Sequence, residues 1–159
     1  MAKLFGKLIG MTLLAVAGSA MAEELISKNY PSAGEDWYLL TDSIRPLTRD
    51  QANVDGVYIA NHYLSMYEPD DSLENFDGDG YTIGYEFIGE YQSYAYVSLF
   101  DCKQQLEATL RVSYYSGVSP SSTTLVHRDE YYSSGTTIGF FIPDNEDLLN
   151  RVCEIARAR

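Results

Sequence analysis

Residues 105–114 show the clearest periodicity in the chain, because apolar and polar side chains alternate there without exception. The apolar positions are Leu106, Ala108, Leu110, Val112 and Tyr114, and the polar ones are Gln105, Glu107, Thr109, Arg111 and Ser113. A period of two places one set of side chains on each face of a β-strand. The pattern therefore predicts a strand with one buried and one solvated face, as is common in antiparallel sheets.

Other segments rich in strand-forming residues precede and follow this one. The expected apolar or strand segments, in chain order, are 37–40, 56–67, 81–91, 94–100, 123–128 and 136–142. We expect turns or loops at 41–43, 68–80 and 116–122, because these stretches are polar and carry Asp, Ser, Gly or Pro.

The period changes at the C-terminal end of the chain. Apolar side chains recur there at intervals of three and four residues, at Leu148, Leu149, Val152, Cys153 and Ala156. This spacing is typical of an amphipathic helix. Pro143 and Asp144 can start such a helix, and Arg157 and Arg159 near its end complement the helix dipole.

The N-terminal segment has the features of a secretory signal peptide. Lys3 and Lys7 precede an apolar run that is too short for a convincing membrane span. Small residues follow and end in Ala20-Met21-Ala22, which matches an A-x-A-type cleavage site. An uncleaved N-terminal anchor is the alternative. Since no Cys stands at the cleavage site, we expect a protein of the periplasm, the cell surface or the medium without a lipid anchor.

Removal of this segment leaves a chain of suitable length for one domain. We expect residues 1–22 to be the signal peptide, residues 23–36 an irregular lead-in, and residues 37–159 one α+β domain. The formal net charge is −12, and it becomes −14 without Lys3 and Lys7. So acidic a surface repels nucleic-acid phosphates and anionic lipid headgroups, and it favours basic partners.

The two cysteines of the chain are Cys102 and Cys153. In an oxidising compartment they allow one intramolecular pairing, so a disulfide between them is the default. A redox or zinc site is disfavoured, because no C-x-x-C occurs and the two histidines are isolated. With Cys102 at the entrance of the regular strand and Cys153 on the helix stripe, the sequence predicts a single antiparallel β-sheet with a C-terminal α-helix tethered by a disulfide.

Residues 75–86, "NFDGDGYTIGYE", match the calcium loop of an EF-hand. The matching residues are Asn75, Asp77 and Asp79 at ligand positions, Gly80 at the turn and Glu86 at the bidentate position. A calcium loop needs a helix on each side, yet Pro69 precedes it and an alternating segment with Gly84 follows. The two Asp-Gly pairs favour a hairpin loop instead. Weak calcium binding is the alternative.

Motifs for catalysis are missing from the sequence. Neither a nucleophile elbow, a zinc-protease helix nor a phosphate-binding loop occurs, and the histidines are His62 and His127. The stretch "HRDE" at 127–130 is interpreted as a solvated strand end. We therefore expect no enzyme, no catalytic or metal-binding residue and no cofactor, although a triad whose members meet only in space leaves no sequence pattern.

Tyrosine is unusually frequent, with 14 residues, five of them within 81–96. Tyrosine is favoured at recognition surfaces, and it also has high strand propensity and fills cores. Both explanations stay open. By alternation, Tyr115 and one member of the Tyr131-Tyr132 pair should point away from the core.

Three segments of the chain resemble the surface-adhesin E (protein E-like) family of small exported proteins of Gram-negative bacteria. They are "DWYLLTDSI" (36–44), "LFDCKQQLEATLRVSYYSG" (99–117) and "FFIPDNEDLLNRVC" (140–153). The shared features are Trp37, Asp42-Ser43-Ile44, Asp101-Cys102, Tyr114-Tyr115, Pro143 and Cys153. The resemblance implies a sheet with a disulfide-tethered helix and a class of adhesin that binds host matrix or plasma proteins, some members also binding haem.

We accordingly expect an exported, non-enzymatic binding protein that engages a protein partner, either host matrix or an envelope component. The alternative is a periplasmic accessory or stress-response protein that binds a small ligand, haem or calcium. A homodimer is a further expectation, since unpaired strand edges invite pairing. The sequence identifies no ligand-binding residue.

Overall fold

A computed structural model describes residues 22–28, 34–49, 52–77, 79, 81–132 and 138–159, without the side chains of residues 52 and 122. The expected signal peptide lies outside these residues, apart from Ala22. Within them, no helix has both the length and the apolar character needed to cross a membrane.

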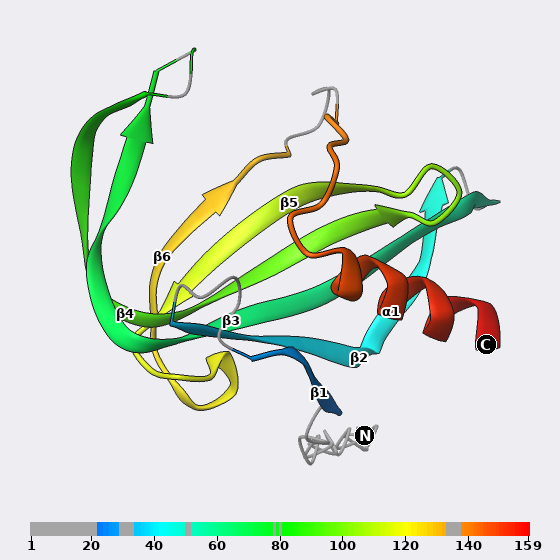
Figure 1. The fold of residues 1–159 in the computed structure, drawn as a ribbon, viewed down its shortest axis with the longest axis horizontal. Coiled ribbons are helices and arrows are strands. Elements are labelled where there is room, and N and C mark those ends of the chain that lie inside the picture. The colour runs from blue at the N-terminus through cyan, green and yellow to red at the C-terminus, as the bar shows by residue number, and fades with distance from the viewer. Residues whose placement is uncertain (1–21, 29–33, 50–51, 78, 80, 133–137) are drawn as a thin grey trace, which may run out of the picture.

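The described residues form one antiparallel sheet in which each strand pairs with its neighbour in the chain (Figure 1). The strands are β1 (Glu23–Ser27), β2 (Glu35–Arg49), β3 (Ala52–Phe76), β4 (Thr82–Asp101), β5 (Leu106–Tyr115) and β6 (Leu125–Glu130). A short 3₁₀-helix, η1 (Pro120–Ser122), follows β5, and helix α1 (Glu146–Ala158) ends the fold. The predicted α+β architecture is confirmed.

The expected irregular lead-in is in part a strand. Residues 23–27 form β1, which pairs antiparallel with β2 from Glu23 opposite Leu40 to Ser27 opposite Trp37. Ile26 packs against the main apolar core, so tertiary contact overrides the weak local signal. The prediction of an irregular segment is wrong for these residues.

Two of the expected turns are also strands. β2 passes through residues 41–43 with an irregular register between Leu40 and Arg45. β3 continues through the polar stretch 68–76 and pairs there with β4, for example Ser72 with Phe87. Cross-strand pairing thus outweighs the turn preference of the polar side chains. The expected strand at 136–142 is absent from residues 138–142, which contribute a single bridge between Phe141 and Glu107.

A register shift in β5 corrects the prediction of one buried and one solvated face. Arg111 pairs with Val97 and Thr109 with Ser98, so Leu110 is an extra residue in the ladder. Such a bulge moves the following side chains to the opposite face. Ala108 therefore packs with Leu99 on one face, whereas Val112 pairs with Tyr96 on the other.

The main core lies between the sheet and α1. Its buried residues are Leu39, Ile44, Ala60, Phe100, Leu148, Leu149, Val152 and Cys153. The helix begins after Asn145, whose side chain accepts a hydrogen bond from the Leu148 amide at 3.1 Å, rather than at Pro143. This cap satisfies an amide that would otherwise be unpaired at a buried helix end.

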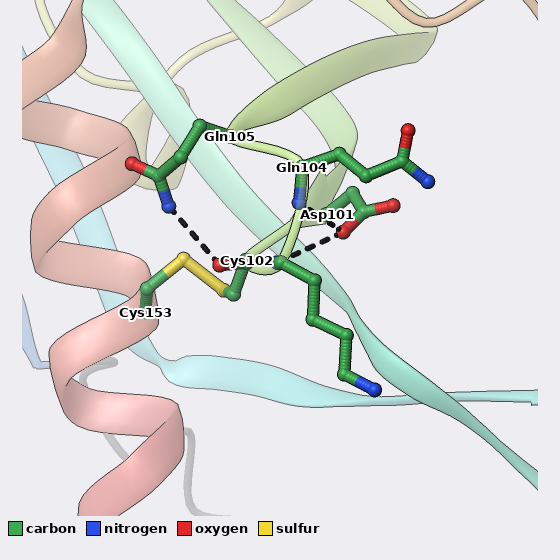
Figure 2. Close-up of a disulfide and its surroundings, with 6 residues drawn as sticks. Asp101, Cys102, Gln104, Gln105 and Cys153 are labelled. Atoms are coloured by element: carbon green, nitrogen blue, oxygen red, sulfur yellow. Dashed lines mark hydrogen bonds between the residues drawn. A yellow bond between two sulfur atoms is a disulfide. The ribbon is translucent and has the colours of Figure 1, made fainter.

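The predicted disulfide joins Cys102 to Cys153, with 5.6 Å between their Cα atoms (Figure 2). The tight turn before β5 presents Cys102 to the helix, because the Asp101 carboxylate accepts from the amides of Lys103 and Gln104, both at 2.9 Å. Gln105 closes the turn with a side-chain amide that donates to the Cys102 carbonyl at 3.1 Å. The bridge therefore fastens α1 to the junction of β4 and β5.

Two regions can now be distinguished. We call residues 67–90 the arm, because the outer parts of β3 and β4 pair there only with each other. We call the remaining described residues the body. The arm (green) rises at one end of the sheet in Figure 1, whereas α1 (red) lies across the other end.

Candidate functional site

The segment that matches a calcium loop is the tip of the arm. One oxygen of the Asp77 carboxylate accepts from the amides of Asp79 and Tyr81, each at 2.9 Å, which closes a tight turn. Glu86 lies in β4 opposite Leu73, and Asn75 lies in β3 opposite Gly84. The predicted hairpin loop is confirmed, and no trio of acidic, His or Cys side chains among the described residues is arranged to hold a metal ion.

A hydrogen-bonded histidine lies in the body, where sequence reasoning saw no site. His62 is 1% exposed, and its Nε2 lies 2.9 Å from Ser98 Oγ and 3.4 Å from Glu107 Oε1. Its Nδ1 accepts from the Trp37 indole at 3.0 Å. The four residues come from β2, β3, β4 and β5, and strand register brings them together.

This cluster contains Ser, His and Glu but does not have the protonation of a catalytic triad. An indole N–H is a donor only, so Nδ1 of His62 is the acceptor and the proton is on Nε2. A general base must instead present an unprotonated nitrogen to the serine hydroxyl. His62 donates toward Ser98 and Glu107, so the cluster acts as a satisfied polar network inside the body.

The second histidine lies in β6. His127 Nε2 is 3.0 Å from Asp129 Oδ1, and both side chains are about one-third exposed, at 31% and 34%. They are two residues apart and therefore share one face of the strand. The other two residues of the stretch 127–130 bond to β5: Arg128 donates to Ser113 Oγ at 3.3 Å, and Glu130 lies 3.8 Å from Arg111.

Many tyrosines of the body are at least half-buried and form an aromatic row on the face that also carries His62. Tyr96 stacks on His62 with ring centroids 4.9 Å apart, and Tyr94 and Tyr114 continue the row. Burial raises the pKa of all three phenols, with neighbouring phenols and carboxylates adding to the effect. These tyrosines bear out the core-filling explanation.

The tyrosines of the arm have the opposite environment. Tyr85 and Phe87 of β4 lie opposite Glu74 and Ser72 and share one face of the hairpin. Ile83 is an extra residue in the ladder, because Asn75 pairs with Gly84 and Phe76 with Thr82, and Tyr81 directly precedes the strand. We call Tyr81, Ile83, Tyr85 and Phe87 the apolar row. Their exposed fractions run from 68% to 75%. Phe76, at the end of β3, is also exposed. The arm thus presents large apolar side chains to solvent instead of burying them.

The outward tyrosines expected in the body are only partly as predicted. Tyr115 is half-buried, whereas Tyr131 and Tyr132 are both exposed rather than one of the pair. Regular alternation fails at the pair because β6 ends at Glu130. In β4, by contrast, the large exposed apolar side chains are Ile83, Tyr85 and Phe87, and all three belong to the arm.

Charge distinguishes the arm as well. Its acidic residues are Glu68, Asp70, Asp71, Glu74, Asp77, Asp79, Glu86 and Glu90, and it contains no Lys or Arg. The nearest basic residues in the chain are Arg49 and Lys103. The arm therefore combines an apolar row with a negative potential.

Comparisons of this chain with protein-family models, curated proteins and solved structures find no match. The functional inference therefore depends on the chemistry of the arm itself.

Proposed function

We propose that this chain is an exported, non-enzymatic binding protein that engages a protein partner through the apolar row of its arm. The supporting observation is the exposure of Tyr81, Ile83, Tyr85 and Phe87, each about 70% accessible. Tyr85 and Phe87 share one face of the hairpin. Contiguous exposed apolar clusters on a folded surface mark interaction sites. Aromatic side chains are also enriched among the residues that dominate binding energy.

Two further features support export and the kind of partner. The Cys102–Cys153 disulfide fits an oxidising compartment outside the cytosol. The resemblance to surface-adhesin E proteins favours a host matrix or envelope protein as the partner. The buried His62 network has the proton on the wrong nitrogen for nucleophilic catalysis, which favours binding over hydrolysis.

Site-specific photo-cross-linking in the producing cells tests the proposal. A benzophenone amino acid replaces Tyr85 in the apolar row, and in a control variant it replaces Leu25, which is 48% exposed on β1. We expect a discrete protein adduct from position 85 that is absent from position 25. Identical adducts at both positions, or none at position 85, would overturn the proposal. Labelling of intact cells with an impermeant reagent then distinguishes cell surface from periplasm.

A cavity in the body favours the alternative, an accessory protein that binds a small apolar ligand such as haem. The cavity has a volume of about 450 Å³ and is lined by Tyr96, Tyr114, Tyr131 and Phe141, among others. This size falls within the range of small-molecule sites. Titration with haemin tests it: a saturable absorbance change that Tyr114→Ala abolishes would support the alternative, and unsaturable adsorption would remove it.

A further inference from the structure

Among the described residues, each of the two strands of the arm has one edge that pairs with no other strand. β2 stops pairing with β3 at Glu35 opposite Met66, and β5 stops pairing with β4 at Tyr115 opposite Ser93. Beyond these points β3 and β4 pair only with each other. An exposed strand edge offers unpaired amides and carbonyls to an incoming chain.

The β3 edge is protected against such pairing. Pro69 has no amide to donate, and the register is irregular on both sides of Asp70. The Asp70 carboxylate accepts from the amides of Asp71 and Ser72, at 2.7 and 3.3 Å. Proline, bulges and self-satisfied backbone groups are the devices by which proteins block edges.

The β4 edge has one such device, an extra residue at Ile83 between Thr82 opposite Phe76 and Gly84 opposite Asn75. Residues 84–88 read "GYEFI" and contain no Pro or Lys. The pairing with β3 is regular from Gly84 opposite Asn75 to Phe87 opposite Ser72, so this part of the edge is open to a neighbour. Five residues match the usual length of a strand.

The acidic side chains of the arm indicate which kind of polypeptide segment can pair with this edge of β4. A second copy would bring a further set of eight acidic side chains against the same eight, so like charges oppose self-pairing. A segment with Lys or Arg at alternate positions would place cations beside Glu86 and its acidic neighbours. Cations also interact favourably with the faces of exposed Tyr and Phe rings.

We infer that the Gly84–Ile88 edge of β4 receives an extended, lysine- or arginine-rich segment of the partner protein, which adds to the arm as a further strand. The inference rests on the proposed function and specifies how the same site recognises its partner. Main-chain hydrogen bonds would supply the register, and the acidic side chains would select the charge.

Binding of defined peptides to the intact chain tests the inference. The probes are fluorescein-labelled Lys-Val-Lys-Val-Lys-Val-Lys, its Glu-Val counterpart, and a basic peptide with two consecutive central backbone nitrogens methylated. Methylation of two neighbours blocks both edges of the peptide, because successive amides point in opposite directions. We expect fluorescence anisotropy to detect binding of the basic peptide, and this binding should weaken at high salt. The other two peptides should show no binding.

Two charge-matched variants locate the site. Glu86→Lys lies on β4, and Asp71→Lys lies on the protected β3 side with the same change of charge. We expect Glu86→Lys to weaken binding of the basic peptide roughly tenfold or more, and Asp71→Lys to weaken the same binding about threefold or less. Far-ultraviolet circular dichroism of both variants checks that the sheet is retained.

The outcomes separate this inference from the proposed function. Equal binding of the methylated peptide, equal effects of the two variants, or a dimer that both variants leave unchanged would overturn strand addition of a basic segment. If the basic peptide fails to bind while position 85 still cross-links to a protein, the inference falls and the proposed function stands. If both fail, the proposed function falls as well.

Discussion

The same two strands, β3 and β4, have opposite environments in the body and in the arm. In the body, Ala60, Leu99 and Phe100 are covered by α1, by neighbouring strands or by the second apolar cluster. In the arm, Tyr85 and Phe87 of β4 have no covering element among the described residues and lie mostly in solvent. Burial is therefore set by what packs on the strand, not by the apolar character of its side chains.

The difference teaches how the arm can stay ordered without a core of its own. A two-stranded hairpin is marginally stable by itself in water. Here the hairpin continues strands whose other halves are fixed in the body. The body stabilises these strands, and the arm supplies the interaction surface. Substitutions in the body should therefore change stability, and substitutions in the arm should change binding.

Removal of the disulfide should have the largest effect, and it acts on the body. The bridge spans 51 residues of chain. Cys102→Ser with Cys153→Ser should lower the free energy of unfolding by about 4 kcal/mol, because the unfolded chain regains the entropy of that loop. Urea titration monitored by tryptophan fluorescence measures it. An unchanged transition would show that the apolar contacts of α1 suffice without the bridge.

Trp37→Phe should have the next largest effect. The substitution removes the indole donor and leaves Nδ1 of buried His62 without its 3.0 Å hydrogen bond. We expect a loss of about 1–3 kcal/mol, the usual cost of an unsatisfied buried polar atom. Calorimetry gives the value, with Trp37→Phe in a His62→Phe background as the control. A full-sized loss in that background would contradict the hydrogen-bond explanation and point to packing.

Alkaline pH should weaken the body through its buried phenols. Burial raises the pKa of Tyr63 to about 12, with Glu23 adding to the rise, and burial and nearby carboxylates raise that of Tyr91 to about 12. A raised folded-state pKa means that stability is complete below the ordinary tyrosine value near 10 and is lost as pH rises from there through about 12. Urea midpoints measured across this window test it; a flat profile would contradict it.

Substitution of the apolar row should affect stability least. Tyr85→Ser with Phe87→Ser removes side chains that are 68% and 75% exposed, so the free energy of unfolding should change by about 0.5 kcal/mol or less. In the same variant, cross-linking to the partner from position 83 should be lost. A large destabilisation instead would show that the row supports the fold, and the contrast between arm and body would fail.

The elements that sequence predicts best are those whose pattern is purely local. Helix α1 and the pairing of Cys102 with Cys153 follow from an apolar period and from cysteine arithmetic. The strand at 68–76 could not be anticipated, because its polar side chains favour turns and only pairing with 82–91 holds them extended. The bulge at Leu110 is likewise invisible, since the alternation in the sequence continues through it.

The candidate site shows the same division. The alternation of Tyr81, Ile83, Tyr85 and Phe87 is visible in the sequence, but their exposure is not, because the pattern of a buried face is identical. The network around His62 was missed because its four members lie on four strands. Alternation does place Trp37 two residues before Leu39, and a register for β2 and β3 would have brought it beside His62.

The nearest-neighbour order of the sheet has a consequence for how the chain reaches its native state. Each strand can pair with the preceding one as soon as it has been synthesised, because no strand pairs with a distant one. The disulfide is different, because Cys153 follows all six strands of the sheet. The thiol of Cys102 therefore gains its partner only after every strand has been made.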